Sequence, residues 1–394
     1  MKVALITFHS FLEEGGVKRH VLALKEEFEK RNIETKIIAP RRKMSEDYGK
    51  DVILLGTSFK LNLGGGISDL VFNFNHFAIE RVLKKEKFDI LHFHNASFPS
   101  FFQILLSPSA FKTLNILTFH SDVARSNFLK TFFPLFLNFC NLRLDGLIAV
   151  SEVALSFFKD FKKPKVLIPN GVNLKDFSPK GEKFKEFLDK KINLLFVGRI
   201  EERKGLIYLL KAFQILKRKY SNLRLIVVGE GPERKNCEDF VKSKNLKDVV
   251  FLGELKEENL FKIYRTADIF CAPSIFGESF GLVILEAMAS GLPVVAFANE
   301  GYKSWLKGKK GEEFLVPPKN YILLSKKIEI LIKNPQKRKE LSQWGQKEAK
   351  KYSWEKISQK VLDFYQTCQK LKEKNNALIN KFGNQMDLQR ENKA

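Results

Sequence analysis

Residues 2–40 read KVALITFHSFLEEGGVKRHVLALKEEFEKRNIETKIIAP, and this stretch decides the fold class. It opens at 2–8 with an apolar run of the kind that forms a central parallel strand. A glycine pair at 15–16 follows, apolar side chains then recur at helical spacing across 20–31, and 35–40 returns to a strand pattern. A strand, a loop, a helix and a second strand in about forty residues predict the start of a Rossmann-type domain.

The alternation of strands and helices continues through both halves of the chain. Apolar runs at 88–94, 114–120 and 144–150 are typical of further buried strands. The turn-rich PNGV at 169–172 follows, and INLLFVGR at 192–199 starts a second alternating set. We therefore expect an α/β protein made of an N-terminal Rossmann-like domain (1–173), a linker (174–190), a C-terminal Rossmann-like domain (191–350), an amphipathic helix (351–374) and a polar tail (375–394).

Length and composition narrow the class of protein. A chain of 394 residues is long for one core and suits two domains. No run of about 20 residues is apolar enough to span a bilayer, and the N-terminus lacks the apolar segment of a signal peptide, so we expect a cytoplasmic protein. The four cysteines are widely spaced without a C-x-x-C pair, which argues against a disulfide framework or a structural zinc site.

The net charge of +23 limits the classes of binding partner that the sequence favours. Such an excess is compatible with nucleic acid, an anionic membrane or a cell with generally Lys-rich proteins. The lysines are scattered over predicted helices and no nucleic-acid motif accompanies them. We expect no nucleic-acid partner and regard an anionic membrane surface as the better candidate.

Two cations follow the first strand of the second domain directly. Arg199 and Lys204 lie in VGRIEERKG, where Gly198 permits close backbone approach at the carboxyl end of the strand. A planar guanidinium and a lysine ammonium at this spacing can converge on one diphosphate. The alternative is a solvated basic turn.

A second polar pattern lies in FGESFGLVILEAMASG, residues 276–291. Glu278 precedes a predicted helix that begins near Gly281 and offers free backbone N–H groups to an anion. Glu286 lies inside that helix among apolar neighbours, so its carboxylate needs a specific partner. That partner is either a sugar diol or, alternatively, a cation of the protein.

Taken together, the motifs of the whole chain resemble those of family 4 glycosyltransferases. That family has the GT-B fold, in which two Rossmann-like domains face each other and a C-terminal helix crosses back to the first. Each short motif is weak alone, but their order and placement in a two-domain pattern are specific. The motifs are GG at 15–16, TFHS at 118–121, PNGV at 169–172, GR…KG at 198–205, VVGEG at 227–231, E-x7-E at 278–286 and ASGLPVV at 289–295.

The resemblance implies a nucleotide-sugar donor site in the second domain. Arg199 and Lys204 match the pair that neutralises the donor diphosphate, and Glu286 matches the glutamate that holds the ribose hydroxyls. Glu278 matches the group around the transferred sugar and its distal phosphate. The backbone that accompanies it comprises Ser279, Phe280, Gly281 and Leu282.

The resemblance also implies three contributions from the first domain. Gly16 lies where the N-terminal glycine loop closes on the phosphates, and His120 matches the histidine that approaches the transferred sugar. The alternative for His120 is a buried histidine at a strand end. Arg125 supplies a cation just after TFHS on the acceptor side.

The mechanism that follows retains the anomeric configuration and needs no metal cofactor. No D-x-D triplet occurs in the chain, so the usual carboxylate pair for a nucleotide-bound divalent ion is missing. Two cations and a helix N-terminus can stabilise the departing diphosphate instead. The leaving phosphate can take the proton of the acceptor, so that His120 positions and stabilises rather than acting as a general base.

A separate question concerns His92 and His94, which share one face of a predicted strand. This spacing is compatible with a metal site, but no third ligand is near in the sequence. We expect these two histidines to line the acceptor cleft or to pack in the core.

Within the family, the chain most resembles phosphatidylinositol mannosyltransferases and related lipid mannosyltransferases. This implies GDP-mannose as the donor and an inositol lipid or similar glycolipid as the acceptor. Two positions depart from the pattern: Asp69 falls where an Arg suited to an inositol phosphate is expected, and HNA at 94–96 replaces His-Glu-Pro. The Phe-rich segment 127–143 is either an interfacial membrane helix beside the acceptor cleft, which would make the protein peripheral to the inner face of the cell membrane, or a helix packed on the first sheet.

Three alternatives stay open. The first is a family 4 enzyme that uses a UDP-sugar, such as UDP-glucose or UDP-N-acetylglucosamine, because E-x7-E does not distinguish the bases. The second is a nucleotide-sugar epimerase or hydrolase on the same frame, and the third is a binding protein with an inactive site. The presence of all four polar donor-site residues argues against the last.

Overall fold

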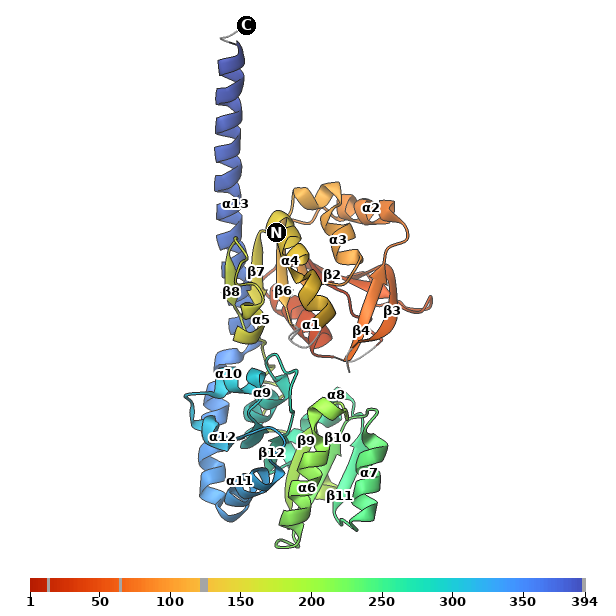
Figure 1. Ribbon diagram of the computed structural model, residues 1–394, viewed down its shortest axis with the longest axis vertical. Helices are drawn as coiled ribbons and strands as arrows, with labels where there is room; N and C mark the ends of the chain where they lie inside the picture. Colours follow the sequence, from red (N-terminus) through yellow and green to blue (C-terminus); the bar gives the residue numbers. More distant parts are fainter. Residues whose placement is uncertain (13–14, 64–65, 121–126, 392–394) are drawn as a thin grey trace. The chain divides into compact units, whose positions relative to one another are not determined.

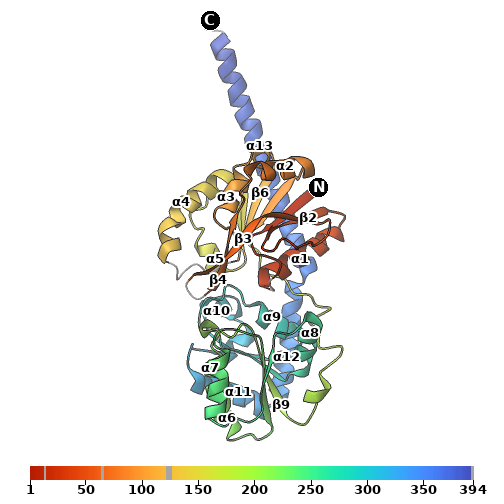
Figure 2. The ribbon, with the colours of Figure 1, turned by 90° about the vertical axis from the view of Figure 1, so that its right-hand side faces the viewer.

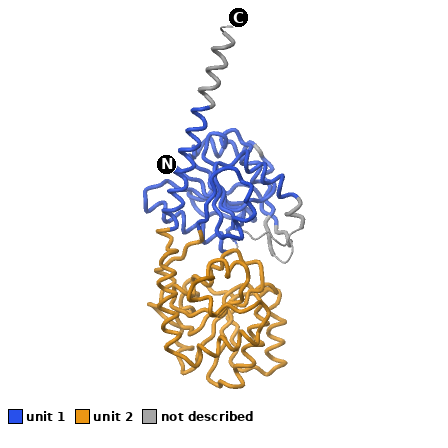
Figure 3. Tube along the Cα trace, turned by 60° about the vertical axis from the view of Figure 1, so that its left-hand side comes forward, with its two compact units in different colours: residues 1–168, 357–394 blue, residues 169–356 orange. Residues whose placement is uncertain are grey.

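The computed structural model describes the backbone of residues 1–12, 15–63, 66–120 and 127–391, and it describes their side chains except for residues 60–63, 66–69, 76, 127–131 and 379–391. The chain divides into two compact units. The first unit combines residues 1–168 with 357–394, and the second comprises residues 169–356 (Figure 3).

The first unit is built on an eight-stranded sheet with the order β4-β3-β2-β1-β5-β6-β7-β8 (Figure 1). Neighbouring strands run parallel except β3 and β4, which pair antiparallel. The strands are β1 (Lys2–Thr7), β2 (Glu34–Arg41), β3 (Val52–Leu63), β4 (Gly66–Phe72), β5 (Ile90–His94), β6 (Leu114–Phe119), β7 (Gly146–Ala149) and β8 (Lys165–Leu167). The helices are α1 (Gly16–Glu29), α2 (His76–Glu86), α3 (Ser100–Leu105), α4 (Asn127–Arg143), α5 (Glu152–Ser156) and most of α13 (Trp354–Glu391).

Helices cover both faces of the first sheet, which explains why its central strands are continuous apolar runs. Figure 2 shows α1 and α4 on opposite sides of this sheet. The face toward α2, α3 and α4 forms one core with Phe93, Phe101 and Leu117. On the other face, Phe28 of α1 packs edge-on against Tyr365 of α13.

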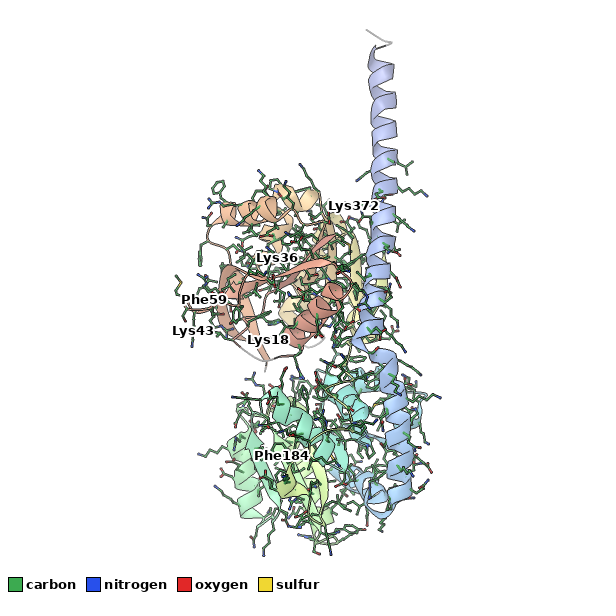
Figure 4. The ribbon with its side chains drawn as sticks, turned by 180° about the vertical axis from the view of Figure 1, so that it is seen from behind. Lys18, Lys36, Lys43, Phe59, Phe184 and Lys372 are labelled. Atoms are coloured by element: carbon green, nitrogen blue, oxygen red, sulfur yellow. The ribbon has the colours of Figure 1, made fainter. Side chains whose placement is uncertain are left out.

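The C-terminal helix α13 is anchored to the sheet of the first unit by polar contacts as well as by packing. Lys372 of α13 donates to the carbonyl oxygen of Thr113 at 2.6 Å and to the carboxylate of Asp145 at 2.8 Å (Figure 4). A Cβ atom added to Gly146 would lie 2.5 Å from the sulfur of Cys368, so α13 approaches β7 closely. The expected return of the C-terminal helix to the first domain is therefore confirmed.

The second unit contains a six-stranded parallel sheet with the order β11-β10-β9-β12-β13-β14. Its strands are β9 (Ile192–Val197), β10 (Leu223–Val228), β11 (Val249–Gly253), β12 (Ile269–Ala272), β13 (Val294–Phe297) and β14 (Leu315–Val316). Its helices are α6 (Leu206–Lys217), α7 (Arg234–Ser243), α8 (Glu257–Thr266), α9 (Leu282–Ala289), α10 (Glu300–Leu306), α11 (Tyr321–Lys333) and α12 (Pro335–Ala349).

Two hydrophobic cores cover the two faces of the second sheet. One core is formed with α6 and α11, and the other with α8, α9 and α10. The segment 174–190, expected as a linker, lies in the second unit and contributes the buried side chains of Phe177 and Phe187. Helix α13 extends to Glu391 and so includes most of the segment 375–394 that was expected as a polar tail.

These observations confirm the predicted fold class, two parallel α/β sheets with a C-terminal helix that joins the first unit. In both sheets the strand order reverses direction once. The first sheet grows outward from β1 toward β4 and then restarts at β5, while the second grows from β9 toward β11 and restarts at β12. Ligands of open α/β sheets bind outside the carboxyl ends of the strands at such a switch point.

Candidate functional site

The predicted donor residues lie in the segments that follow β9 and β12, the two strands on either side of the switch point of the second sheet. Arg199 follows β9, and Lys204 ends a 3₁₀ turn at Glu202–Lys204 just before α6. Glu278 follows β12, and Glu286 lies in α9. Because β9 and β12 are hydrogen-bonded neighbours, residues far apart in the sequence meet at one edge of the sheet.

Glu278 is the centre of a hydrogen-bonded ionic network. Its Oε1 atom accepts from Lys204 Nζ at 2.5 Å, from Ser274 Oγ at 3.0 Å and from an Arg203 guanidinium nitrogen at 3.3 Å. The Glu278 side chain is only 10% exposed and that of Lys204 14%. Two of the four predicted polar residues, Lys204 and Glu278, are therefore in direct contact.

The cations determine the charge state of Glu278. Burial raises the pKa of this carboxyl, but the charges of Lys204 and Arg203 and the hydrogen bonds from Lys204 and Ser274 together lower it by more, so that the pKa lies below its usual value. The carboxylate is therefore ionised at neutral pH. Arg203 also pairs with Glu201 at 2.5 Å, so the network joins two carboxylates, Glu278 and Glu201, to their basic neighbours.

Arg199 is the accessible cation of this site. Its side chain is 44% exposed, and its Nε atom lies 3.6 Å from Glu201. The backbone beside it requires glycine, because a Cβ atom on Gly229 would lie 2.1 Å from the carbonyl oxygen of Gly198. The close strand ends thus fix the backbone from which Arg199 extends.

The turn before α6 also depends on one glycine. Gly205 has a φ of +66°, and a Cβ atom there would lie 2.2 Å from the carbonyl oxygen of Pro273. Because Gly205 has no side chain, the loop that carries Lys204 packs directly against the segment after β12. This close packing brings the ammonium of Lys204 to the carboxylate of Glu278.

Helix α9 begins at the site without a side-chain cap. Its N-cap, Gly281, has a φ of +89°, and α9 has no acidic residue in its first turn. A Cβ atom on Gly281 would lie 2.3 Å from the ring of Tyr302. A helix N-terminus with this arrangement is suited to an anion such as a phosphate.

The segment 279–282 shapes the site mainly through the position of its backbone. Phe280 is buried and stacks on Trp305, with 5.3 Å between ring centroids. The indole N–H of Trp305 donates to the carbonyl oxygen of Phe280 at 2.8 Å. These contacts fix the chain just before α9, and Ser279, Gly281 and Leu282 complete the predicted segment around the helix start.

Glu286 lies on the buried side of α9. It is 3% exposed, and its Oε2 atom accepts a hydrogen bond from the hydroxyl of Tyr264 at 2.9 Å. The sequence indicated that this carboxylate needs a partner, and Tyr264 of α8 is one. A carboxylate held by a neutral hydroxyl keeps acceptor capacity for another donor.

The first unit gathers histidines at its own switch point. Gly16 is the first residue of α1, His94 ends β5 and His120 directly follows β6. His94 Nδ1 and His120 Nε2 are 3.2 Å apart, and the ring of His20 lies 5.0 Å and 4.7 Å from those of His94 and His120. Arg125, predicted on the acceptor side, lies outside the described residues.

His120 is held by a neighbour that the sequence did not single out. Its backbone N–H donates to the side-chain oxygen of Asn95 at 2.7 Å, and Asn95 has a φ of +64°. Asparagine tolerates this left-handed conformation better than most residues do. Burial lowers the pKa of His120 well below its usual value, and the charges of His20, His92 and His9 add to that effect.

His92 and His94 have different surroundings although they share one strand face. His92 uses both ring nitrogens, with Thr118 Oγ1 and the hydroxyl of Tyr365 each at 2.6 Å. Its environment is that of a packed, hydrogen-bonded core residue. No third ligand is near these two histidines in the sequence, but the fold brings His20 and His120 close to His94 in space.

The Phe-rich helix α4 has a packed face and an exposed face. Phe133, Phe136 and Phe139 pack against the first core, whereas Phe132 and Leu135 are 50% and 69% exposed. The packing alternative for segment 127–143 is therefore observed along one face of this helix. Among the described residues, no helix is long and apolar enough to cross a membrane.

Sequence reasoning missed five residues that shape these two sites. Except for Ser274, which lies four residues before Glu278, each of them meets a partner that is far away in the sequence. A sequence signal exists only where the topology brings adjacent strand ends together. His20 is such a case, since it lies in the first half of α1, the helix that follows β1, and β1 is the neighbour of β5. The missed residues are His20, Asn95, Arg203, Tyr264 and Ser274.

Comparison with known proteins agrees with this arrangement. Residues 179–348 match the model of "Glycosyl transferases group 1", and residues 14–176 match that of "Glycosyltransferase Family 4". A phosphatidyl-myo-inositol mannosyltransferase from Mycobacterium leprae is 30% identical over 379 residues, which cover 93% of this chain and 97% of the relative. The chain belongs to glycosyltransferase family 4.

Other relatives of this glycosyltransferase extend the likeness in sequence and in fold. A phosphatidyl-myo-inositol mannosyltransferase from Mycolicibacterium smegmatis is 28% identical and covers 93% of this chain and 94% of its own length. A glycosyltransferase from Rickettsia africae superimposes with a TM-score of 0.74 at 19% identity, over 94% and 99% of the two chains. Sucrose-phosphate synthase from Thermosynechococcus elongatus gives 0.71 at 21% identity, over 93% and 98%. The structural matches show the GT-B fold, and family membership makes the chain a retaining glycosyltransferase.

Proposed function

We propose that this glycosyltransferase moves mannose from GDP-mannose to a hydroxyl of phosphatidylinositol or of a related glycolipid. The observation that carries the proposal is the likeness to relatives named phosphatidyl-myo-inositol mannosyltransferases along 93% of the chain. The cationic site at the switch point of the second sheet supports a nucleotide diphosphate sugar as the donor.

In the proposed reaction, the protein stabilises the diphosphate as it leaves. Arg199 and Lys204 bind the diphosphate oxygens, and the N-terminus of α9 faces the distal phosphate. Arg203 adds a third cation, so the three basic side chains outnumber the two carboxylates of the site, Glu278 and Glu201. These groups take over the electrostatic work that a divalent metal does in other transferases.

The bonds and protons balance without a protein nucleophile. The bond from the anomeric carbon to the diphosphate oxygen breaks, and the acceptor hydroxyl oxygen forms a new bond to that carbon on the same face. The acceptor's proton passes to the leaving phosphate oxygen. Glu286 binds the ribose diol, Glu278 and the backbone of 279–282 hold the sugar and its distal phosphate, and Gly16 lies at the glycine loop that closes on the phosphates.

His120 would act on the transferred sugar as a neutral hydrogen-bonding group. Its lowered pKa keeps the imidazole uncharged at neutral pH, and Asn95 fixes the backbone from which it extends. A neutral imidazole suits positioning and transition-state stabilisation better than cation binding. Arg125 is proposed on the acceptor side, where it would pair with a phosphate of the acceptor.

We further propose that the protein works at the cytoplasmic face of an anionic membrane. The exposed face of α4 carries Phe132, Leu135 and Leu142, and the chain has a net charge of +23. Apolar side chains on a helix of a cationic protein favour the interface of an anionic leaflet. Co-sedimentation should be strong with vesicles that contain anionic lipid and weak with neutral vesicles, and equal partitioning would exclude this attachment.

The experiment that tests the function is a transfer assay with radiolabelled sugar nucleotides and lipid vesicles in the presence of a chelator. We expect label from GDP-mannose to enter the lipid phase only when the vesicles contain phosphatidylinositol or a glycolipid acceptor. Glu278→Gln, which keeps size and loses charge, is the matched inactive control. Incorporation from a UDP-sugar but not from GDP-mannose would replace the proposed donor, and release of free sugar without an acceptor would indicate a hydrolase.

A further inference from the structure

A second cluster of chemically capable side chains lies in the first unit, apart from the ionic network of the donor site. One ring nitrogen from each of His20, His94 and His120 lies within 4.8 Å of the other two. The three residues come from α1, from the end of β5 and from the position after β6. His20 and His94 are 3% and 0% exposed.

The spacing of the ring nitrogens fits ligands of one metal ion. Zinc binds imidazole nitrogen at about 2.0–2.1 Å, so two ligands of one tetrahedral ion lie roughly 3.3 Å apart. His94 Nδ1 and His120 Nε2 are 3.2 Å apart. Three histidines with a fourth, open position form a recurrent zinc site, and imidazole also suits nickel, copper and cobalt.

His94 has binding capacity that the protein does not use. Its Nδ1 atom, the one that lies 3.2 Å from His120 Nε2, meets only another imidazole among the described residues. Its buried Nε2 atom has no hydrogen-bond partner among those residues either, and it is not the nitrogen that faces the cluster. The neighbouring His92 shows the contrast, because hydrogen bonds to Thr118 and Tyr365 occupy both of its nitrogens.

The protonation state of the cluster also suits a metal. Burial lowers the pKa values of His94 and His120 well below the usual value, and the charges of the neighbouring histidines lower them further. Neutral imidazoles present lone pairs, whereas imidazolium ions repel a cation. His94 ends β5 and His120 directly follows β6, and these two strands are parallel neighbours in the centre of the first sheet.

We propose that His20, His94 and His120 form a binding site for a zinc-type transition-metal ion, and that an ion bound there inhibits transfer. The inhibitory part rests on the proposed function, because it assumes that His120 acts on the transferred sugar. An ion held by His120 occupies the ring nitrogen that would otherwise meet the sugar. Binding itself does not depend on that assumption.

The test of binding uses the full chain without a polyhistidine tag, dialysed against a chelator and then titrated with Co²⁺ or Zn²⁺. We expect one Co²⁺ per chain with visible ligand-field absorption typical of a tetrahedral nitrogen site. His20→Asn and His94→Asn should each weaken binding by more than about tenfold, because even outer-shell changes cost about 10- to 100-fold. His76→Asn, a change outside the cluster, should leave binding unaltered.

A measurement on the wild-type protein keeps the proposal testable even if the histidine variants do not fold. Crystals soaked with Zn²⁺ should show an anomalous peak at the zinc edge between His20, His94 and His120. Absence of a peak there and of stoichiometric Co²⁺ binding would overturn the site, as would binding that survives both cluster variants. Zn²⁺ should also inhibit mannose transfer reversibly, and the inhibition should be weaker in the His20→Asn variant. Metal binding without inhibition would confirm the site but contradict the assumption that His120 acts on the transferred sugar.

Discussion

The two switch points of this enzyme have the same topology and opposite chemistry. In the second unit, charged side chains lie near the strand ends, where Lys204 and Arg203 both donate hydrogen bonds to one carboxylate oxygen of Glu278. In the first unit, the corresponding place carries imidazoles, whose pKa values are lowered by burial. The difference shows that the fold supplies a place for a ligand, while the residues at the strand ends decide which ligand suits it.

The two sites also differ in how their buried polar groups are satisfied. Glu278 is compensated by two cations and by the hydroxyl of Ser274, so the removal of one partner leaves a buried charge with fewer contacts. Among the described residues, His94 meets another histidine and keeps one nitrogen without a hydrogen-bond partner. We therefore expect mutations in the second unit to act on the diphosphate, and changes of pH or of metal concentration to act on the first unit.

The largest effect on activity should come from the cations of the second unit. Lys204→Ala and Arg199→Ala each remove a charge that stabilises the leaving diphosphate, and kcat/KM should fall by on the order of 10²-fold or more. Steady-state transfer assays measure this. Lys211→Ala, a change on α6 where the ammonium lies over the ring of Tyr208, is the matched control and should retain activity. Normal turnover in both single variants would contradict the proposed diphosphate site.

A drop in pH should lower the stability of the first unit more than that of the second unit. His92, His94 and His120 have lowered pKa values in the folded protein, so the unfolded chain binds more protons than the folded one below about pH 6.5. Each imidazole that stays neutral when folded lowers the free energy of unfolding by up to about 1.4 kcal/mol per pH unit below that point. The groups that face these histidines are His9, His20, Thr118 and Tyr365.

The second unit gives the internal control for this pH effect, because all six histidines precede residue 121. The lowered pKa of Glu278 contributes stability that is lost only as the pH falls below the usual carboxyl range. Amide exchange of peptides from each unit, compared at about pH 6.5 and about pH 5.5 with a chelator present and corrected for intrinsic rates, should show loosening in the first unit. Equal loosening of both units would rule out the histidines as the cause.

A smaller change tests whether the position of Glu278 matters. A Cβ atom on Gly301 would lie 1.8 Å from the carbonyl oxygen of Glu278, so Gly301→Ala forces α10 away from the loop that carries this carboxylate. We expect about a tenfold loss in kcat/KM, because small misplacements of a catalytic group cost this much or more. An active Gly301→Ala enzyme with unchanged Tm would show that this packing does not position Glu278.

The smallest expected effect concerns the hydroxyl that holds Glu286. Tyr264→Phe removes one hydrogen bond of 2.9 Å and leaves the ring contacts with Phe177 and Phe270. One hydrogen bond to a charged group is worth about 1.5–3 kcal/mol at most, and a ribose diol can replace part of it. KM for the sugar nucleotide should rise about fivefold with kcat nearly constant. A selective fall in kcat would place Glu286 in the chemical step instead.

The sequence predicted most of the fold, because the buried strands were visible as β-branched apolar runs. The assignment of Arg199, Lys204, Glu278 and Glu286 to a donor site stays a prediction, and the structure places these residues in the segments that follow β9 and β12. Their exact pairing could not be predicted, since Lys204 and Glu278 lie 74 positions apart and meet only because β9 and β12 are neighbours.

One physical reason explains why the remaining residues were not predicted. Arg203, Ser274 and Tyr264 are ordinary residues in the sequence and gain their chemistry from side chains that the fold brings close. His20 was overlooked because the distance from His94 was judged along the chain rather than across adjacent strand ends. Segment 174–190 belongs to the second unit and buries Phe177 and Phe187 there. Its polar composition gave no sign of this burial in the sequence.

The central claim, a GDP-sugar site at the switch point of the second sheet, is tested most directly by nucleotide binding. Thermal unfolding should be followed with GDP, UDP and ADP at equal concentration and with a chelator present, for the wild type and for Lys204→Ala. A ligand that binds only the folded state raises Tm by mass action. We predict the largest shift with GDP and its loss in Lys204→Ala. A larger shift with UDP or ADP, or a GDP shift that persists in Lys204→Ala, would contradict the account.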